Sequence, residues 1–255
     1  MSQGLSPNLV LMTCHDYLFY ASQDYGSMAR PANVIGSYAL MYAVNRSIPE
    51  IRRLLSGNKP HYEEDLPKMK IYATPAAPVN SFPYTSSTNN RWLEHQIQLG
   101  GPLNQSWQPA SLEKITWNSV GESLLDKMQP DRLNIPKVGA YYKFPPLSSF
   151  YFYTVGGSVP SVFRIGKKYS TARLNVIALE SEEKKGMFQP TCPVNVSDLP
   201  KETKIRKGSI LTIPPTPLLI ASELEGSYLE CRDPTGIIHL IPRPKKGRFI
   251  GSWGD

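Results

Sequence analysis

The sequence predicts an α+β fold in which one principal helix follows the first strand and strands dominate the remainder. The 255 residues include 24 prolines, nearly twice the usual share of roughly 5%, which disfavours long helices. Only one segment has a sustained helical repeat of apolar residues, and several short segments have the composition of strands. Hydrophobic residues make up 40% of the chain and charged residues 19%, so a generically disordered polypeptide is excluded.

The first strand and the principal helix lie within the first 45 residues. Asn8–Tyr20 carries leucine, valine, threonine and aromatic residues with imperfect alternation, which is typical of a mostly buried strand or of two short strands. Arg30–Asn45 predicts the helix, and Pro31 suits its first turn. Apolar residues recur in it at intervals of three and four: Val34, Tyr38, Met41 and Tyr42.

Two short elements and an insertion follow the helix. Ile51–Leu55 is expected to add a helical turn, and Lys70–Ala73 a strand that ends at the prolines after it. Residues 80–111 are rich in serine, asparagine, glycine and proline with little periodicity, which predicts a long insertion or a flexible loop. Trp92 and Trp107 are unusual for a linker, so this segment is expected to dock on a partner or, with equal weight, on its own domain.

The second half of the chain is predicted to consist of strands. Ser148–Val155 (SSFYFYTV) has a strong strand composition, and Val162–Ile165 with Ala172–Leu179 form a hairpin-like unit around GKKYS. Asp233–Gly236 (DPTG) is a turn, because proline at its second position and glycine at its fourth favour one. After the charged stretch Glu180–Lys185, four strands are expected: Ser209–Ile213, Leu218–Ala221, Tyr228–Arg232 and Ile237–Ile241.

Basic residues gather in one part of the sequence. The net charge of +7 and a pI near 9.2 suit a polyanionic partner without requiring one. Arg132–Leu179 contains seven basic residues and no acidic one, and nine aromatic residues lie within Tyr141–Tyr169. Cations meet phosphates while ring faces stack on bases, so this pattern predicts a surface for single-stranded nucleic acid. For Phe150 and Phe152 a place in the core is favoured over stacking.

A second basic cluster closes the chain. It contains Arg243, Lys245, Lys246 and Arg248, with no acidic residue between positions 234 and 254. Charge runs are usually solvated, so the cluster is weaker support for nucleic-acid binding than the first one.

Most enzymatic motifs are absent from the sequence. It contains no P-loop, no dinucleotide fingerprint and no H-E-x-x-H, which disfavours nucleotide hydrolysis and zinc proteolysis. The four histidines are dispersed. His15 and Asp16 are neighbours, but adjacent strand residues point to opposite faces, so they make a poor dyad. His61–Asp65 could chelate a cation, although a solvated loop is favoured. Neither a metal nor a cofactor is expected.

The cysteines and the absence of long apolar runs indicate the compartment. Cys14, Cys192 and Cys231 are odd in number and widely separated, so buried or idle thiols are expected rather than disulfides or zinc ligands. No apolar run approaches the roughly 20 residues that span a bilayer, and Met1–Pro7 lacks the cationic start of a signal peptide. A cytoplasmic protein without a membrane partner is therefore expected.

Five spaced segments within residues 9–180 resemble the Cas-five-class subunit of type I-D CRISPR Cascade, in its Csc-one branch. These segments are CHDYLFYASQDYG (Cys14–Gly26) with the Val34–Asn45 helix after it, IYATPAAPV (Ile71–Val79), NIPKVGAYYKFPPLSSFYFY (Asn134–Tyr153) and FRIGKKYSTARLNV (Phe163–Val176). Residues 80–131 and the C-terminal third match only loosely.

The resemblance implies a repeat-associated (RAMP) RNA-binding fold. Its expected form is a ferredoxin-like, RRM-related βαββαβ core in residues 1–180 with a thumb-like insertion at about 80–131, and a β-rich C-terminal portion, 181–255, packed on it. Such subunits cap the 5′ handle of CRISPR RNA (crRNA). They lie against the large subunit near the protospacer-adjacent motif of target DNA, and the thumb reaches a backbone subunit. We expect this chain not to be a catalyst itself, because its scattered histidines offer no supported partner for general acid–base cleavage.

The resemblance and the charge pattern together give the candidate site. Ile165–Lys168 resembles the Gly-Arg-Arg/Lys hairpin that relatives use on the handle, where glycine allows close approach and the cations meet phosphates. Trp92 and Trp107 are candidate partner contacts. The candidate nucleic-acid-binding residues are Tyr141, Lys143, Arg164, Gly166, Lys167, Lys168, Tyr169, Arg173, Arg243, Lys245, Lys246 and Arg248.

Two alternatives from other classes stay open. Relatives of another subtype cleave precursor RNA with tyrosine, lysine and histidine, so a metal-independent endoribonuclease using His15 with a tyrosine and a lysine is the first. A scaffold that binds only protein is the second, and it predicts no salt-sensitive affinity for RNA.

Overall fold

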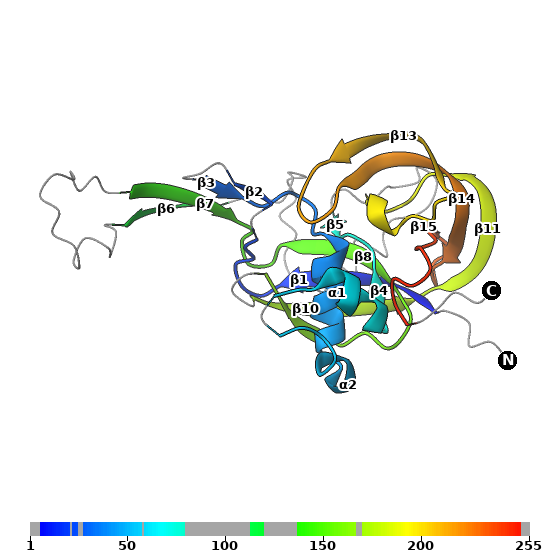
Figure 1. Cartoon of the computed structure of the whole chain (residues 1–255), viewed down its shortest axis with the longest axis horizontal. Helices are drawn as coiled ribbons and strands as arrows, with labels where there is room; N and C mark the ends of the chain where they lie inside the picture. The colour runs from blue at the N-terminus through cyan, green and yellow to red at the C-terminus, as the bar shows by residue number, and fades with distance from the viewer. Residues whose placement is uncertain are drawn as a thin grey trace, which may run out of the picture.

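A computed structural model describes residues 6–20, 22–24, 28–57, 59–79, 113–119, 137–166 and 170–250. Its central sheet is antiparallel, in the order β4-β8-β1-β10-β9, with β5 also paired to β8 (Figure 1). The strands of this sheet are β1 (Pro7–Cys14), β4 (Tyr72–Ala73), β5 (Ala77–Pro78), β8 (Ser149–Val155), β9 (Val162–Ile165) and β10 (Ser170–Ala178). The sequence prediction for β1, β8 and the β9–β10 hairpin is thereby confirmed, with β1 ending at Cys14 rather than Tyr20.

The principal helix starts later than the sequence predicts. Helix α1 spans Ser37–Arg46, and Arg30, the first residue of the predicted helix, ends strand β3 (Met28–Arg30). Backbone hydrogen bonds of 2.9 Å in both directions join Ile35 to Ala76, which holds the chain extended just before the helix. Pro31 therefore lies outside the helix, and a tertiary contact sets the start that local periodicity placed earlier. The short helices are α2 (Pro49–Arg52), α3 (Tyr62–Asp65) and η1 (Leu66–Lys68).

A second, curled sheet is built around β14. It comprises β11 (Glu180–Phe188), β12 (Val194–Asn195), β13 (Lys204–Leu211), β14 (Leu218–Arg232) and β15 (Ile238–Pro242), with the short helix η4 (Val196–Asp198) after β12. One prediction is wrong here, because β14 is one strand of 15 residues rather than two. The charged stretch Glu180–Lys185, for which the sequence predicted no element, is part of β11. Most of the charged side chains of β11 are exposed to solvent, so their charges are not buried when this segment forms a strand. The turn at Asp233–Gly236 is confirmed by a 3.0 Å bond from Gly236 N–H to the Asp233 carbonyl.

A four-stranded arm projects from the body of the molecule (Figure 1). Its strands run in the order β2 (Gln23–Asp24), β3 (Met28–Arg30), β7 (Lys137–Lys143) and β6 (Glu113–Ser119). Strand β6 falls within the insertion expected at 80–131, which the sequence predicted to lack regular structure only up to residue 111. Trp92 and Trp107 lie outside the described residues. The arm therefore draws strands from both sides of the expected insertion.

The two larger sheets share one hydrophobic core. Cys231 and Ile241 of the curled sheet belong to the same buried cluster as Leu9 of β1. A polar contact also joins the layers, because the Tyr153 hydroxyl lies 3.0 Å from Nδ1 of His239. Both residues are fully buried. The C-terminal sheet is therefore packed on the central sheet rather than linked loosely to it.

Candidate nucleic-acid interface

The register of β9 and β10 places two arginines on one exposed face of the central sheet. Arg164 lies opposite Thr171, and Arg173 lies opposite Val162 on one side and Thr13 of β1 on the other. Because side chains alternate along a strand, Arg164 and Arg173 are diagonal neighbours on the same face. Both side chains are exposed, and no carboxylate of the described residues forms an ion pair with either. Two uncompensated guanidinium groups on one face suit a polyanion.

The same face is covered farther along the sheet. Side chains alternate along β8, so Tyr151 and Tyr153 lie on the same face of the sheet as Ser149. The Tyr151 hydroxyl donates a 3.1 Å hydrogen bond to the Thr191 carbonyl of the C-terminal portion. At the exposed end, the hydroxyls of Thr13 and Ser149 are 3.3 Å apart. The C-terminal portion therefore covers one end of this face and leaves the arginine end accessible, with hydroxyl groups beside the cations.

Gly166 forms the turn after β9 and is required by the fold. Its φ is +82°, and a side-chain carbon there would lie 2.8 Å from Leu18 Cδ1 and 2.9 Å from the Phe19 carbonyl oxygen. The sequence reasoning assigned the close approach at this glycine to RNA, but the neighbour at that position is the chain's own segment at residues 18 and 19. Lys167, Lys168 and Tyr169, which follow, lie outside the described residues.

Lys143 joins this region from the end of the arm. Its Nζ lies 5.2 Å from the centre of the Tyr17 ring, in the geometry of a cation–π contact. The Tyr17 carbonyl accepts a 2.6 Å hydrogen bond from the Ser170 hydroxyl, which ties this segment to the start of β10. The Tyr17 side chain is 40% exposed. The structure therefore brings Lys143, Tyr17 and the β9–β10 turn together.

Tyr17 is a candidate stacking residue that the sequence reasoning missed. It belongs to the CHDYLFYASQDYG segment, but it lies far from the basic cluster in sequence, so nothing local signalled it. Asp16 precedes it, is exposed, and accepts a 3.4 Å bond from the Thr171 amide. That carboxylate is the one acidic group among the described contacts of the hairpin, and it opposes phosphate binding at its own position.

The aromatic part of the sequence pattern is largely a core pattern. The prediction that Phe150 and Phe152 are buried is confirmed. Among the nine aromatics, those at most 4% exposed are Phe144, Phe150, Tyr151, Phe152, Tyr153 and Phe163. Their rings are buried, so stacking on bases is a wrong prediction for the four that the sequence did not already favour as core: Phe144, Tyr151, Tyr153 and Phe163. Tyr142 is half-buried, and Tyr169 and the side chain of Tyr141 lie outside what the structure describes.

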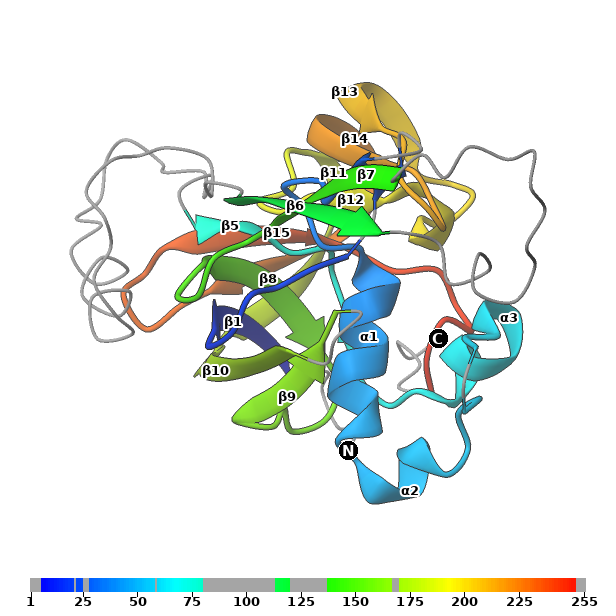
Figure 2. The same ribbon diagram turned by 90° about the vertical axis from the view of Figure 1, so that its left-hand side faces the viewer.

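In the C-terminal basic cluster, Arg243 and Arg248 each pair with a carboxylate. Nε of Arg248 lies 3.2 Å from Oδ1 of the buried Asp198, and the Arg248 side chain is 14% exposed. Arg243 donates to Glu183 at 2.8 Å. Lys245 and Lys246 are exposed. Figure 2 shows that the C-terminal segment with residues 243–248 lies beside α3, whereas the β9–β10 hairpin lies on the opposite side of α1. The C-terminal basic cluster and the basic residues of the hairpin therefore do not form one surface.

The three cysteine thiols and His239 are buried and are poor candidates for catalysis. Burial raises the pKa of each of the three thiols, Cys14, Cys192 and Cys231, to about 12, so the thiolate is scarce at neutral pH. The His239 ring lies between two polar side chains. Its Nδ1 is 3.0 Å from the Tyr153 hydroxyl, and its Nε2 is 3.4 Å from Oδ2 of Asp233. All three are at most 5% exposed. Burial lowers the pKa of His239, whereas hydrogen bonds from Thr235 and Ile237 lower the pKa of Asp233, so a neutral imidazole bridging a carboxylate and a hydroxyl is a structural connection.

The described residues contain neither a metal-binding cluster nor a helix that could span a membrane. Within those ranges no group of three or more histidine, cysteine, aspartate or glutamate residues could hold a metal ion. The His61–Asp65 run is not the solvated loop that was expected, because His61 precedes α3 (Tyr62–Asp65). Asp65 is buried there and accepts hydrogen bonds from the Tyr42 hydroxyl and the His61 amide. No helix in the described part of the chain is long and apolar enough to cross a membrane.

Comparisons with known proteins place this geometry in a family. A search of curated proteins gave no match. Among solved structures, a chain of the type III-B Cmr-beta complex, determined by cryo-electron microscopy with cognate target RNA and AMPPnP, is similar at a TM-score of 0.46 and 10% identity. That alignment covers 85% of this chain and 86% of the other. The family model of the type I-D CRISPR-associated protein Cas5/Csc1 matches residues 8–247, and the chain therefore belongs to the Cas5/Csc1 family of the type I-D CRISPR system.

Proposed function

We propose that this subunit binds and caps the 5′ handle of crRNA, using the face that carries Arg164 and Arg173. The observation that supports this most directly is the pair of exposed arginines that have no carboxylate partner among the described residues, beside the turn that leads into Lys167 and Lys168. Phosphate contacts fix the position of a nucleic acid without reading its bases, and guanidinium groups suit them. Tyr17, beneath Lys143, would offer a ring face to a base at the edge of this surface.

The topology supports a ferredoxin-like, RRM-related core for residues 1–180. The strands β4, β8, β1 and β10 lie in the spatial order that a βαββαβ chain produces, with α1 as the connection after the first strand. Between β8 and β10 the described chain contains β9, which pairs at the sheet edge, instead of a second helix. We assign residues 181–255 to a β-rich C-terminal portion, and the packing of β11–β15 on the central sheet supports this.

The arm supports a contact with a neighbouring subunit. It extends away from the body (Figure 1), which would let it, together with the segment bearing Trp92 and Trp107, reach a backbone subunit. We propose further that the subunit lies against the large subunit, helps it to engage target DNA near the protospacer-adjacent motif, and acts in the cytoplasm without catalysing a reaction itself.

The salt dependence of RNA binding tests the handle proposal. The double variant Arg164→Gln/Arg173→Gln is expected to reduce the slope of log affinity against log salt by about 1.4, since each contact to a single strand contributes about 0.7. Adding Lys167→Gln and Lys168→Gln should roughly double that reduction. The measurement is titration of repeat RNA at several salt concentrations.

A matched variant controls for net charge. Lys201→Gln/Lys207→Gln removes the same charge from two exposed lysines of the C-terminal portion, and its slope should stay near that of the unmodified protein. An Arg164/Arg173 variant that remains folded and keeps the original slope would contradict the assignment of this face.

The endoribonuclease alternative gains one observation from the structure. His15 is exposed two residues before Tyr17, whose ring lies beneath Lys143, so a histidine, a tyrosine and a lysine occur in one region. These residue types can transfer protons during metal-independent cleavage of RNA. We favour the non-catalytic role because no contact among the described residues orients the His15 ring toward either partner.

Incubation with repeat RNA in the presence of a chelator separates the two functions. We expect the RNA to remain intact, as measured on a denaturing gel. Cleavage that disappears in His15→Ala and in Lys143→Ala, but persists in Lys201→Gln, would establish the nuclease instead.

A further inference from the structure

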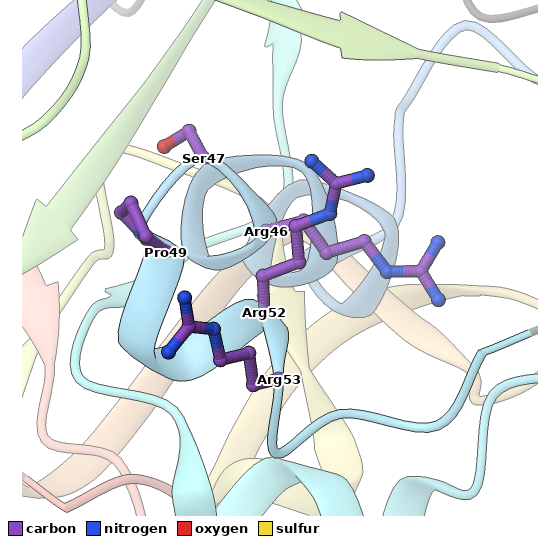
Figure 3. Close-up of a pocket in the computed structure, with 5 residues that line it drawn as sticks. All are labelled: Arg46, Ser47, Pro49, Arg52 and Arg53. Atoms are coloured by element: carbon purple, nitrogen blue, oxygen red, sulfur yellow. The ribbon is translucent and has the colours of Figure 1, made fainter.

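A cluster of three arginines surrounds a cavity at the junction of α1 and α2, away from the residues assigned above. The cavity has a volume of about 410 Å³ and is lined by Arg46, Ser47, Pro49, Arg52 and Arg53 (Figure 3). Arg46 ends α1, whereas Arg52 ends α2 and Arg53 follows it. Figure 3 shows their side chains arranged around the turn that joins the two helices.

The fold itself accounts for Arg46. Its Nη2 donates to the Ser56 carbonyl at 3.0 Å, and its guanidinium carbon lies 5.1 Å from the centre of the Tyr42 ring. A cation in the last turn of a helix also complements the negative end of the helix dipole. Arg46 is therefore held in place before any ligand arrives.

The fold does not account for Arg52 and Arg53. Both are exposed, and none of the described carboxylates lies within ion-pair distance of Arg46, Arg52 or Arg53. Elsewhere Arg206, Arg243 and Arg248 each pair with a carboxylate. Between residues 46 and 62 the single acidic residue is Glu50, which does not line the cavity. The cavity thus has an excess of positive charge that nothing in the described fold neutralises.

We propose that Arg46, Arg52 and Arg53 form a second phosphate-binding site, which holds the backbone of a nucleic acid. An arginine side chain can donate two parallel hydrogen bonds to two phosphate oxygens. Because the fold already holds Arg46 in place, less conformational entropy is lost when a phosphate binds. The lining includes no aromatic ring for stacking on a base and, apart from Pro49, no apolar side chain. The site therefore recognises charge rather than sequence.

A phosphodiester fits this lining better than an acidic protein segment. Protein interfaces derive most of their affinity from buried aromatic and apolar anchors, and the cavity offers only Pro49 for such contacts. Phosphate groups need only charge and hydrogen-bond donors, which three guanidinium groups supply. The backbone can come from single-stranded RNA or from duplex DNA, since both present the same group.

The test compares two double variants of the full chain. Arg52→Gln/Arg53→Gln removes two cations, and glutamine preserves helix propensity at α2. Lys201→Gln/Lys207→Gln removes the same charge elsewhere. Each protein is titrated with a mixed-sequence single-stranded RNA and with a duplex DNA of equal length, at several salt concentrations.

We expect the arginine variant to reduce the salt slope for its true ligand, by about 1.4 for single-stranded RNA or about 1.8 for duplex DNA, while the lysine variant leaves it unchanged. The probe that shows the reduction identifies the source of the phosphate. Equal reductions in both variants, or none in either, would overturn the site. Polyglutamate that binds the unmodified protein and loses affinity only in the arginine variant, with both nucleic-acid slopes unchanged, would overturn it in favour of an acidic protein partner.

The outcome is distinguishable from that of the handle proposal. Failure of that proposal appears in Arg164→Gln/Arg173→Gln, whereas failure of this one appears in Arg52→Gln/Arg53→Gln. The two pairs lie on different elements, so losses at two independent sites should add in the combined variant.

Discussion

Replacement of Phe152 by alanine is expected to lower the free energy of unfolding by about 3–5 kcal/mol, the usual cost of removing a buried aromatic ring from a core. Phe152 lies in the middle of β8, opposite Val10 of β1, and its side chain is fully buried. The ring fills space between packed elements, so the substitution leaves a cavity that the surrounding strands can close only in part. Urea denaturation followed by circular dichroism measures the loss.

Tyr17→Ala is the matched comparison for Phe152→Ala. The Tyr17 side chain is 40% exposed, so we expect a loss of stability below about 1 kcal/mol, together with weaker binding of single-stranded RNA. A Phe152→Ala protein with unchanged stability but reduced RNA affinity would show that β8 exposes its rings after all.

The central sheet was predictable because its strands carry their own signals. The composition of SSFYFYTV and the two strands that flank GKKYS are local properties, and the structure has strands there. The same rings misled the functional interpretation. A strand that is buried on both faces has a continuous apolar run, and in sequence such a run next to cations looks like a stacking surface. The difference lies in what covers the sheet, which only the packing of α1 and the C-terminal portion decides.

The parts that failed depend on contacts between distant residues. The start of α1 follows from the pairing of Ile35 with Ala76, and no local pattern encodes it. The Glu180–Lys185 run, for which the sequence predicted no strand, forms one because β14 provides its partner. The grouping of Arg46, Arg52 and Arg53 around one cavity was likewise missed, because their spacing matches no binding motif.

The C-terminal basic cluster also depends on contacts between residues that are distant in sequence. In sequence, Arg248 is one of four cations with no acid nearby, which suggested contact with phosphates. In the structure its guanidinium group meets Asp198, fifty residues earlier, and it also donates to the Ser197 carbonyl at 3.1 Å. RNA binding by this cluster stays a prediction, and Lys245 and Lys246 are its better candidates because both are exposed.

Removal of the Arg248 side chain is expected to destabilise the protein by about 3–5 kcal/mol near neutral pH, because it leaves a buried carboxylate without its cation. Asp198 is 2% exposed and accepts hydrogen bonds from the hydroxyls of Tyr38 on α1 and Tyr72 on β4. Those two bonds remain in Arg248→Ala, but the positive charge is lost. Arg243→Ala is the matched control. Its partner Glu183 is 46% exposed, so a loss of about 1 kcal/mol or less is expected.

The loss in Arg248→Ala should also grow with pH. Burial raises the pKa of Asp198 to about 6, while Arg248, the two tyrosines and Lys245 act to lower it. A carboxyl group whose pKa is raised on folding contributes stability below its unfolded pKa, and this contribution disappears as the pH rises through the folded value. Without Arg248 the folded pKa moves higher still, so the variant loses stability over a wider range of pH. Urea unfolding of both proteins at about pH 5 and about pH 8 checks this, since the Asp198 carboxyl of the unmodified protein is mostly neutral at the first pH and mostly ionised at the second. A difference between the two proteins that is the same at both pH values would show that Arg248 stabilises the fold through packing on Tyr38 and not through the charge of Asp198.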